Sequence, residues 1–262
     1  MHFITSLGND EEASFIKKEL DYLGISVDYT KEEFRPTTLK TRVRANGKTL
    51  LRISRLEENL LDEVHQNEIY SFLIDVIQDP DLLIICDFNY GIMSDTLLEK
   101  VTNISIKNDV PISADSQSSS QLGDISRYKK VLLVTPTERE ARLALRNKED
   151  NLTVISDLLR SDCEAQYVII TLGENGILIN QDYDEKNWKT DQIRALNHSP
   201  IDVAGAGDSL LTVSSLALIS GASIWEASYI GSIAAAIQVS RVGNLPIDIE
   251  QLRNTLDVDY EK

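Results

Sequence analysis

The sequence is poor in cysteine and histidine, and this limits the chemistry it can carry. Its 262 residues include only two cysteines, Cys86 and Cys163, and three scattered histidines. Two distant cysteines form neither a disulfide framework nor a metal-binding pattern, so we expect a reducing, cytoplasmic environment. Cys86 ends the apolar run 82–85, and we expect it to be a small buried hydrophobe.

Basic residues are also scarce relative to acidic ones. The chain has 26 Lys and Arg against 42 Asp and Glu, a formal net charge of -16. This balance argues against nucleic acid as a partner, because phosphate backbones favour Lys and Arg. It still allows a phosphorylated small ligand, since a local basic cluster can work within an acidic protein.

The sequence shows no signal for export or membrane insertion. Residues 1–12 contain no basic segment followed by an apolar stretch. Residues 209–225 are uncharged, but they include six Ser or Thr residues and are followed by Glu226. We therefore expect a buried helix there and no membrane partner.

Short apolar runs alternate with helical segments along the chain, which predicts an α/β fold with a mainly parallel sheet. The strand runs are rich in Val, Ile and Leu with little alternation, as expected for strands covered on both faces. The expected strands are 82–86, 131–134, 167–171 and 177–180. The expected helices are 11–23, 57–77, 95–99, 137–145, 154–161, 207–220 and 224–240.

Residues 37–54 depart from this rhythm. Asn46-Gly47 is a strong hairpin signal between two β-prone arms. Lys40, Arg42 and Arg44 alternate along the first arm, so the hairpin should have one basic face. Taken alone, this segment is either a solvated edge ribbon or a lid that faces a ligand.

The segment from Asp202 to Asp208 is glycine-rich and precedes a long helical run. Gly205 and Gly207 allow a sharp turn and close approach to a ligand. Such a turn directs free amide groups and the positive end of the helix dipole toward an anion. A carboxylate there could accept a proton during phosphoryl transfer, which depends mainly on positioning and charge stabilisation. The plain alternative is tight packing, with Asp208 capping the helix.

A second segment, 168–176, is a strand running into a glycine turn. Ligands of open parallel sheets bind beyond the carboxyl ends of the strands, so both segments should meet at one edge. On its own, an ordinary β-hairpin turn would be the favoured interpretation of this segment.

Together the two segments resemble the PfkB family of carbohydrate kinases. Asp202-Val-Ala-Gly-Ala-Gly-Asp208 is similar to the family's Asp-Thr-x-Gly-Ala-Gly-Asp signature, and 168–176 to its nucleotide-side strand and turn. The resemblance implies a ribokinase-like three-layer α/β/α sandwich with a mainly parallel sheet. It also implies one kinase domain over 1–262, with a lid hairpin at about 35–55.

The hairpin region is similar to the lid of the heptose-phosphate kinase branch of this family, through Arg35-Pro-Thr-Thr38, Lys40-Thr-Arg42 and Leu50-Leu-Arg52. That branch phosphorylates the anomeric hydroxyl of a heptose 7-phosphate. Two alternatives remain: a ribokinase-like or fructokinase-like kinase of another sugar, and a catalytically impaired module that binds a nucleotide or sugar phosphate.

The resemblance also implies roles for individual residues. Asp208 would be the catalytic base, and the amides of Gly205, Ala206 and Gly207 would form the anion hole. The implied cofactors are ATP and Mg²⁺, and the implied partners are a sugar phosphate and a second copy of the chain. The remaining expected site residues are Thr171, Gly173, Gly176, Asp202, Ser232 and Gly243 for ATP, Lys40, Arg42, Arg52 and Asp87 for the substrate, and Glu140 for the metal.

The chain also departs from the family pattern. It begins near the family's Gly-x-Asp-x-x-Gly region, so we expect the usual first strand and helix to be missing, in either a fragment or a natural truncation. The metal motif Asn-x-x-Glu reads Thr137-x-x-Glu140, and a common Asn on the penultimate helix falls at Ser232. The Gln-Gln pair of the heptose-phosphate branch is replaced within 47–49, and the acidic residue after its Arg is Ser54.

Overall fold

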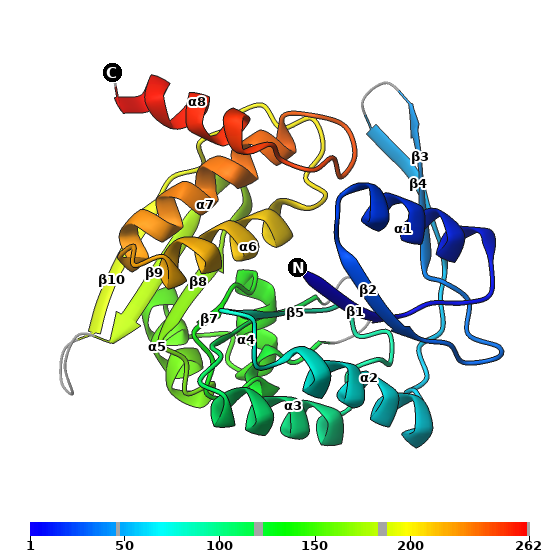
Figure 1. Cartoon of the computed structure of the whole chain (residues 1–262). Helices are drawn as coiled ribbons and strands as arrows, with labels where there is room; N and C mark the ends of the chain where they lie inside the picture. The colour runs from blue at the N-terminus through cyan, green and yellow to red at the C-terminus, as the bar shows by residue number, and fades with distance from the viewer. Residues whose placement is uncertain (46–47, 118–122, 183–187, 261–262) are drawn as a thin grey trace. The chain divides into compact units, whose positions relative to one another are not determined.

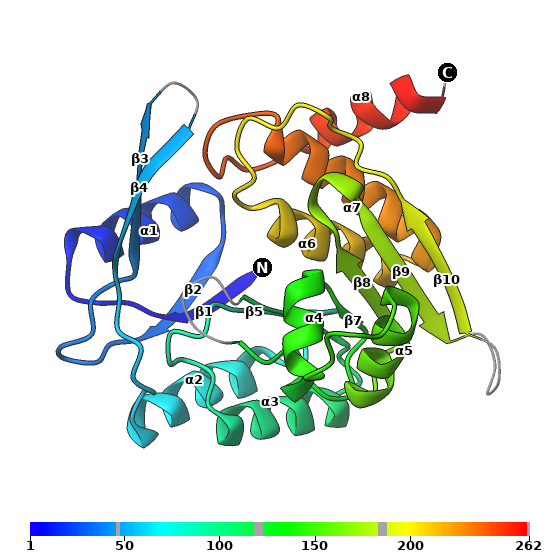
Figure 2. The ribbon, with the colours of Figure 1, turned by 180° about the vertical axis from the view of Figure 1, so that it is seen from behind.

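A computed structural model describes residues 1–45, 48–117, 123–182 and 188–260 (Figures 1 and 2). The chain divides into two compact units. Unit 1 comprises Met1–Pro80 and Asn89–Val110, and unit 2 comprises Asp81–Phe88 and Pro111–Lys262.

Unit 1 combines a parallel strand pair, a hairpin and three helices. Strands β1 and β2 pair in parallel, and α2 packs on both of them and on α3. The elements are β1 (His2–Ser6), α1 (Glu11–Tyr22), β2 (Ser26–Thr30), β3 (Leu39–Ala45), β4 (Lys48–Arg55), α2 (Glu63–Val76) and α3 (Asp95–Lys107).

Helix α2 is shorter than the sequence predicts, because its cap lies further along the chain. Asp62 is the N-cap, and its carboxylate accepts a hydrogen bond from the amide of His65. Upstream, the carboxylate of Glu57 accepts from the amides of Glu58 and Asn59, which gives that stretch a turn instead of a helix. Helix α1 ends as expected, with Gly24 at a φ of 69°.

Strands β3 and β4 form the expected antiparallel hairpin. Arg42 lies directly opposite Arg52, and the register shifts between Val43 and Arg44. The expected Asn46-Gly47 turn lies outside the described residues.

Unit 2 is built on a six-stranded sheet with the order β10-β9-β8-β7-β6-β5. Strands β5 to β8 are parallel to one another, and β9 and β10 are antiparallel to their neighbours. The strands are β5 (Leu83–Asp87), β6 (Ile112–Ser116), β7 (Leu133–Val134), β8 (Tyr167–Thr171), β9 (Ile177–Asp182) and β10 (Trp188–Ile193). The helices are α4 (Glu138–Ala144), α5 (Leu152–Asp162), α6 (Ala206–Ile219), α7 (Ile224–Val239) and α8 (Ile249–Tyr260).

Helices cover both faces of this sheet. Helices α6 and α7 pack on one face and α4 and α5 on the other, as Figures 1 and 2 show from opposite sides. In β8, Val168, Ile169 and Ile170 are all fully buried, which explains the continuous apolar run. Burial of each such side chain contributes about 1.5–3 kcal/mol. The expected three layers are therefore present in unit 2.

The uncharged run 209–225 is most of α6, a turn and the start of α7. In the described part of the chain, no helix is both long and apolar enough to cross a membrane.

Candidate active site

Polar residues of unit 2 gather where the parallel strands end. Asp87 ends β5, Asp115 lies near the end of β6, and Thr171 ends β8. Thr137 follows β7 and forms a parallel bridge with Thr171. These residues therefore lie at the carboxyl ends of the parallel strands, where α/β proteins bind ligands.

The glycine-rich turn opens α6 with an uncapped N-terminus. Gly205 is the N-cap at a φ of 80°, and no side chain caps the helix. Such a start leaves amide groups without intrahelical partners and places positive charge at the helix mouth. The amide of Ala206 makes a long contact of 3.5 Å with the carbonyl oxygen of Val203. Asp208 lies half-buried in this first turn.

The turn is held in place by side chains around it. The carboxylate of Asp202 accepts hydrogen bonds from the amides of Ala204 at 3.2 Å and Gly243 at 3.3 Å. The side-chain amide of Gln238 donates to the carbonyls of Ala204 at 3.2 Å and Gly243 at 2.9 Å. Asp202 and Gly243 are thus brought together, and both serve to fix the loops. Sequence reasoning missed Gln238, whose signal is a lone amide in the apolar run of α7.

Three carboxylates act on the buried Asp115 at the ends of the parallel strands. Asp115 is 6% exposed, and burial raises its pKa to about 8, with further contributions from Glu140, Asp208 and Asp87. Like charges close together repel, and a divalent cation would relieve that repulsion. Asp115 was also missed from the sequence, where its signal is an acid that follows the short segment Ile112-Ser113-Ala114.

Cys86 corrects an expectation, since the residue is exposed and not buried. It lies in β5, an edge strand of the sheet, and pairs with Asp115 in register. Its sulfur is nevertheless desolvated, and this effect together with the charges of Asp208 and Asp115 raises the thiol pKa to about 12. The thiol therefore stays protonated beside the acid cluster.

Glu140 has a structural partner that explains its altered motif. One carboxylate oxygen of Glu140 accepts from the amide and the hydroxyl of Thr137, each at 2.8 Å. The hydroxyl of Thr137 accepts in turn from the amide of Glu140, so the pair forms a capping box at the start of α4. Glu140 is 9% exposed and is the strongest charge acting on Asp115.

Asp87, expected to contact substrate, is held by neighbouring side chains. Its carboxylate accepts a hydrogen bond from the hydroxyl of Tyr128 at 2.6 Å and lies 3.9 Å from the guanidinium of Arg127. Burial and the charge of Asp87 raise the pKa of Tyr128 well above its ordinary value. The phenol therefore remains a donor to Asp87.

The expected nucleotide-side residues differ in what fixes them. The amide of Thr171 donates to the carbonyl of Pro136 at 2.8 Å. Gly176 has a φ of 89°, and a Cβ there would lie 2.0 Å from the carbonyl oxygen of Ile193, so packing alone requires glycine. Gly173, at a φ of 59°, has open space around it. The hydroxyl of Ser232 donates to the carbonyl of Ser228 at 2.7 Å within α7.

The expected substrate residues of the hairpin belong to unit 1. Arg42 and Arg52 are exposed and face each other across the strands. Within the described residues, neither guanidinium has an ion-pair partner. Lys40 is half-buried, with its ammonium 4.8 Å from the ring centroid of Tyr90. Like charges directly opposite in a hairpin destabilise it, unless an anion lies between them.

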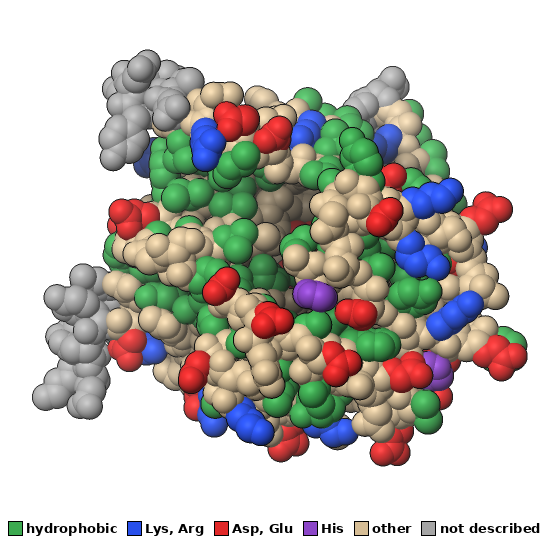
Figure 3. Space-filling view, in the orientation of Figure 1, with side chains coloured by type: hydrophobic (Ala, Val, Ile, Leu, Met, Phe, Trp, Pro, Cys, Tyr) green, Lys and Arg blue, Asp and Glu red, His purple; other side chains and the backbone are tan. Residues whose placement is uncertain are grey.

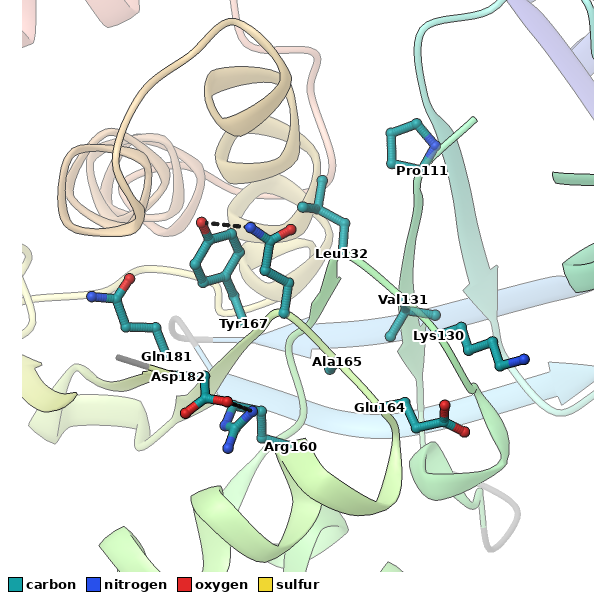
Figure 4. Close-up of a pocket in the computed structure, with 11 residues that line it drawn as sticks. Pro111, Lys130, Val131, Leu132, Arg160, Glu164, Ala165, Tyr167, Gln181 and Asp182 are labelled. Atoms are coloured by element: carbon teal, nitrogen blue, oxygen red, sulfur yellow. Dashed lines mark hydrogen bonds and ion pairs between the residues drawn. The ribbon is translucent and has the colours of Figure 1, made fainter. Parts of the chain in front are cut away.

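Unit 2 also contains a cavity away from this edge. It is lined at the amino-terminal ends of β6, β7 and β8 by Pro111, Leu132 and Tyr167, among others. In Figure 4, Arg160 lies against Asp182, with 3.4 Å between the charged atoms. The cavity therefore lies at the amino-terminal ends of the parallel strands, and the acid cluster lies at their carboxyl ends.

On the surface, acidic side chains are interspersed with basic ones over the face drawn in Figure 3.

Comparison with known proteins identifies the family. The model of the pfkB family carbohydrate kinases matches residues 1–249. The chain belongs to the pfkB family of carbohydrate kinases. The match covers both units, and it confirms the expectation of a carbohydrate kinase drawn from the signature at 202–208.

Individual relatives agree with this assignment. The chain is 31% identical over 242 residues to the bifunctional protein HldE of Helicobacter hepaticus, covering 91% of this chain and 48% of that protein. It is 29% identical over 259 residues to the bifunctional protein HldE of Campylobacter jejuni serotype O:6, covering 98% of this chain and 52% of that protein. The pfkB chain therefore spans about half the length of the curated relatives it matches.

Solved structures of kinases share the fold. Phosphofructokinase-2 of Escherichia coli superposes with a TM-score of 0.79 at 16% identity, covering 98% of this chain and 81% of that one. Ribokinase of Giardia lamblia gives 0.78 at 18% identity, covering 98% and 82%. The expected ribokinase-like α/β fold is confirmed.

Proposed function

We propose that this pfkB protein is an ATP-dependent sugar kinase that phosphorylates the anomeric hydroxyl of a heptose 7-phosphate or a related sugar phosphate. The observation that carries the proposal is the uncapped N-terminus of α6, with Asp208 in its first turn. This arrangement combines an anion-binding helix mouth with a carboxylate that can accept a proton. We regard both units as parts of one kinase domain.

Asp208 acts as the general base in this proposal. It removes the proton from the sugar hydroxyl, whose oxygen then attacks the terminal phosphorus of ATP. The bond from that phosphorus to the β,γ-bridging oxygen breaks, and ADP leaves. The amides of Gly205, Ala206 and Gly207 donate to the phosphoryl oxygens on which charge develops. Because those amides lie at a helix N-terminus, they need no reorganisation during the reaction.

The acid cluster suits a divalent cation. Mg²⁺ prefers carboxylate and water oxygens, and it would neutralise charge on the phosphates of ATP. We assign Glu140 to this role, as the sequence predicts, and add Asp115 as a second carboxylate. Thr171, Gly173, Gly176 and Ser232 would border the nucleotide, and Asp202 and Gly243 would shape the loops around it.

The basic face of the hairpin supports a phosphorylated substrate. Arg42 and Arg52 lie opposite each other without an ion-pair partner among the described residues, and Lys40 lies on the same face of β3. A phosphate held between the two guanidiniums would turn a repulsive pair into a favourable one. We assign Lys40, Arg42 and Arg52 to the substrate phosphate and Asp87 to the sugar.

A substrate panel tests the proposal. The protein would be assayed for ADP release with Mg-ATP and either heptose 7-phosphate, the same heptose without phosphate, ribose or fructose. We expect a kcat/KM for the phosphorylated heptose at least a hundredfold above that for the unphosphorylated sugars. Preference for ribose or fructose would favour a ribokinase-like or fructokinase-like enzyme. ATP binding without turnover on any sugar would favour a binding module.

The hairpin's other face favours self-association. Val43, Leu51 and Ile53 alternate along it and are 43%, 53% and 53% exposed. We propose that this apolar face contacts a second copy of the chain in a homodimer, and that the enzyme works in the cytoplasm, where ATP is available. Leu51→Glu should convert a dimer into a monomer in sedimentation experiments. A wild-type monomer at all concentrations would refute this part.

A further inference from the structure

Arg35 lies just before β3, and its guanidinium has several hydrogen-bond acceptors. It is 7% exposed. Its Nε donates to the carboxylate of Glu32 at 2.8 Å. Its two terminal nitrogens donate to backbone carbonyls, those of Glu57 at 3.3 Å, Tyr90 at 3.1 Å and Asn59 at 2.6 Å. The guanidinium therefore gathers three carbonyls and one carboxylate from separate segments.

We call the segment before β3 the entry root of the hairpin and the segment after β4 its exit root. The three carbonyls belong to the exit root and to a distant turn. Glu57 and Asn59 follow β4 directly, so Arg35 links the chain entering the hairpin to the chain leaving it. Tyr90 precedes Gly91, whose carbonyl accepts from the amide of Leu61 at 2.8 Å. A Cβ on Gly91, at a φ of 78°, would lie 1.9 Å from the carbonyl oxygen of Asn59. Backbone meets backbone here at a distance that only glycine allows.

The entry root is held from a second side as well. The hydroxyl of Thr37 accepts from the amide of Gly8 at 2.8 Å, and the amide of Thr37 donates to the carboxylate of Asp10 at 2.8 Å. By contrast, Arg55 at the exit root makes a half-exposed ion pair of 2.6 Å with Glu12. Such an exposed pair contributes little to stability. Arg35 is therefore the principal buried link between the two roots.

The acidic residues near Arg35 already have basic partners. Ligand atoms of Glu32, Asp62 and His65 lie within 4.8 Å of one another, a spacing that could hold a metal ion. Glu32 is paired with Arg35, however, and Nδ1 of His65 lies 2.6 Å from the carboxylate of Asp62. His65 is thus paired and partly buried. A buried guanidinium needs such a counter-charge, which Glu32 supplies.

We propose that Arg35 is a positioning residue that fixes the phosphate-binding face of the hairpin by clamping both of its roots to the Tyr90–Gly91 turn. The inference rests on the proposed function for its effect on substrate. The ammonium of Lys40 also makes a cation–π contact with the ring of Tyr90. The same turn therefore positions Lys40, a proposed substrate residue. Lysine cannot replace Arg35, because a point charge lacks the planar fork that reaches several acceptors.

Arg35→Lys tests the clamp, with Arg55→Lys as the matched control at the exit root. We expect Arg35→Lys to raise the KM for the sugar phosphate at least tenfold while the KM for ATP changes less than twofold. Hydrogen exchange of amides in β3 and β4 should accelerate at least tenfold, with β8 unchanged. Arg55→Lys should change both KM values less than twofold. Gly91→Ala disturbs the same junction from its other side and should give the same pattern if Arg35→Lys does not fold.

Inorganic phosphate provides a readout independent of turnover. In the wild type it should slow hydrogen exchange in the hairpin, and in Arg35→Lys this protection should be lost. Equal protection in both proteins would overturn the inference, as would an unchanged KM for the sugar phosphate or parallel changes in both KM values. Absence of transfer to any sugar phosphate by the wild type would refute the proposed function alone, and the phosphate experiment would still decide the role of Arg35.

Discussion

Replacing Asp115 by asparagine should make the protein more stable and less active. Burial and the neighbouring carboxylates raise the pKa of Asp115 from 3.8 to about 8. At pH 7 the folded protein therefore keeps a proton that the unfolded chain has lost. A pH of 7 lies about 3 units above the unfolded-state pKa of 3.8, and each unit corresponds to about 1.36 kcal/mol. The buried carboxyl therefore lowers the free energy of unfolding at pH 7 by about 4 kcal/mol.

The sign of the pH dependence follows from proton binding. Between pH 4 and 8 the folded state binds more protons at Asp115 than the unfolded state does, so this contribution to stability falls as pH rises. Asparagine has nearly the same shape but does not titrate. The unfolding free energy of Asp115→Asn should exceed that of the wild type by about 2–4 kcal/mol at pH 7. The gap should shrink toward pH 4.

Urea unfolding without divalent cations measures this gap. Both tryptophans of the chain, at positions 188 and 225, belong to unit 2, so their fluorescence reports on the unit that contains Asp115. Asp162→Asn, which removes an exposed carboxylate paired with Lys129, is the control and should change stability by less than about 1 kcal/mol. A gap for Asp115→Asn that stays constant from pH 5 to 8 would refute the reasoning.

Three further predictions concern the first turn of α2, the glycine turn before α6 and the hairpin. Asp62 raises the pKa of His65 above 6.5, so the stabilisation is complete below pH 6.5 and is lost as pH rises through the folded-state pKa. His65→Gln should thus lower the melting temperature at pH 6 but not at pH 9, and an equal loss at both would contradict this. Gly205→Ala, at a φ of 80°, should cost roughly 1–2 kcal/mol in urea unfolding and weaken ATP binding in calorimetry; unchanged affinity would exclude this turn from the nucleotide site. Arg42→Ala should raise the KM for the sugar phosphate and reduce its salt dependence, and a KM equal to that of the wild type would remove Arg42 from the substrate site.

The sheet of unit 2 could be predicted because its strands are covered on both faces. Val168 to Ile170 form a continuous apolar run, and the expected strand 167–171 agrees with β8. The expected helix 207–220 also differs from α6 by only one residue at each end. By contrast, the expected helix 57–77 began too early, because the capping carboxylate of Asp62 and the turn made by Glu57 outweigh helix propensity.

The start of α6 could be predicted because a local motif forms it. The glycine turn and Asp208 are contiguous in the sequence, so their arrangement at a helix N-terminus could be inferred. Asp115 and Gln238 could not be found in this way, because their importance arises from contacts with segments far along the chain. Cys86 was placed wrongly because an apolar run does not reveal that its strand lies at the edge of a sheet.

In the proposed mechanism, Asp208 takes the proton from the sugar hydroxyl. The most direct test is single-turnover phosphoryl transfer from Mg-ATP to the heptose phosphate by wild type and Asp208→Asn, with ATP affinity measured on both proteins. We expect transfer by Asp208→Asn to fall at least a thousandfold while ATP affinity changes less than threefold. Transfer within tenfold of the wild-type rate would contradict it.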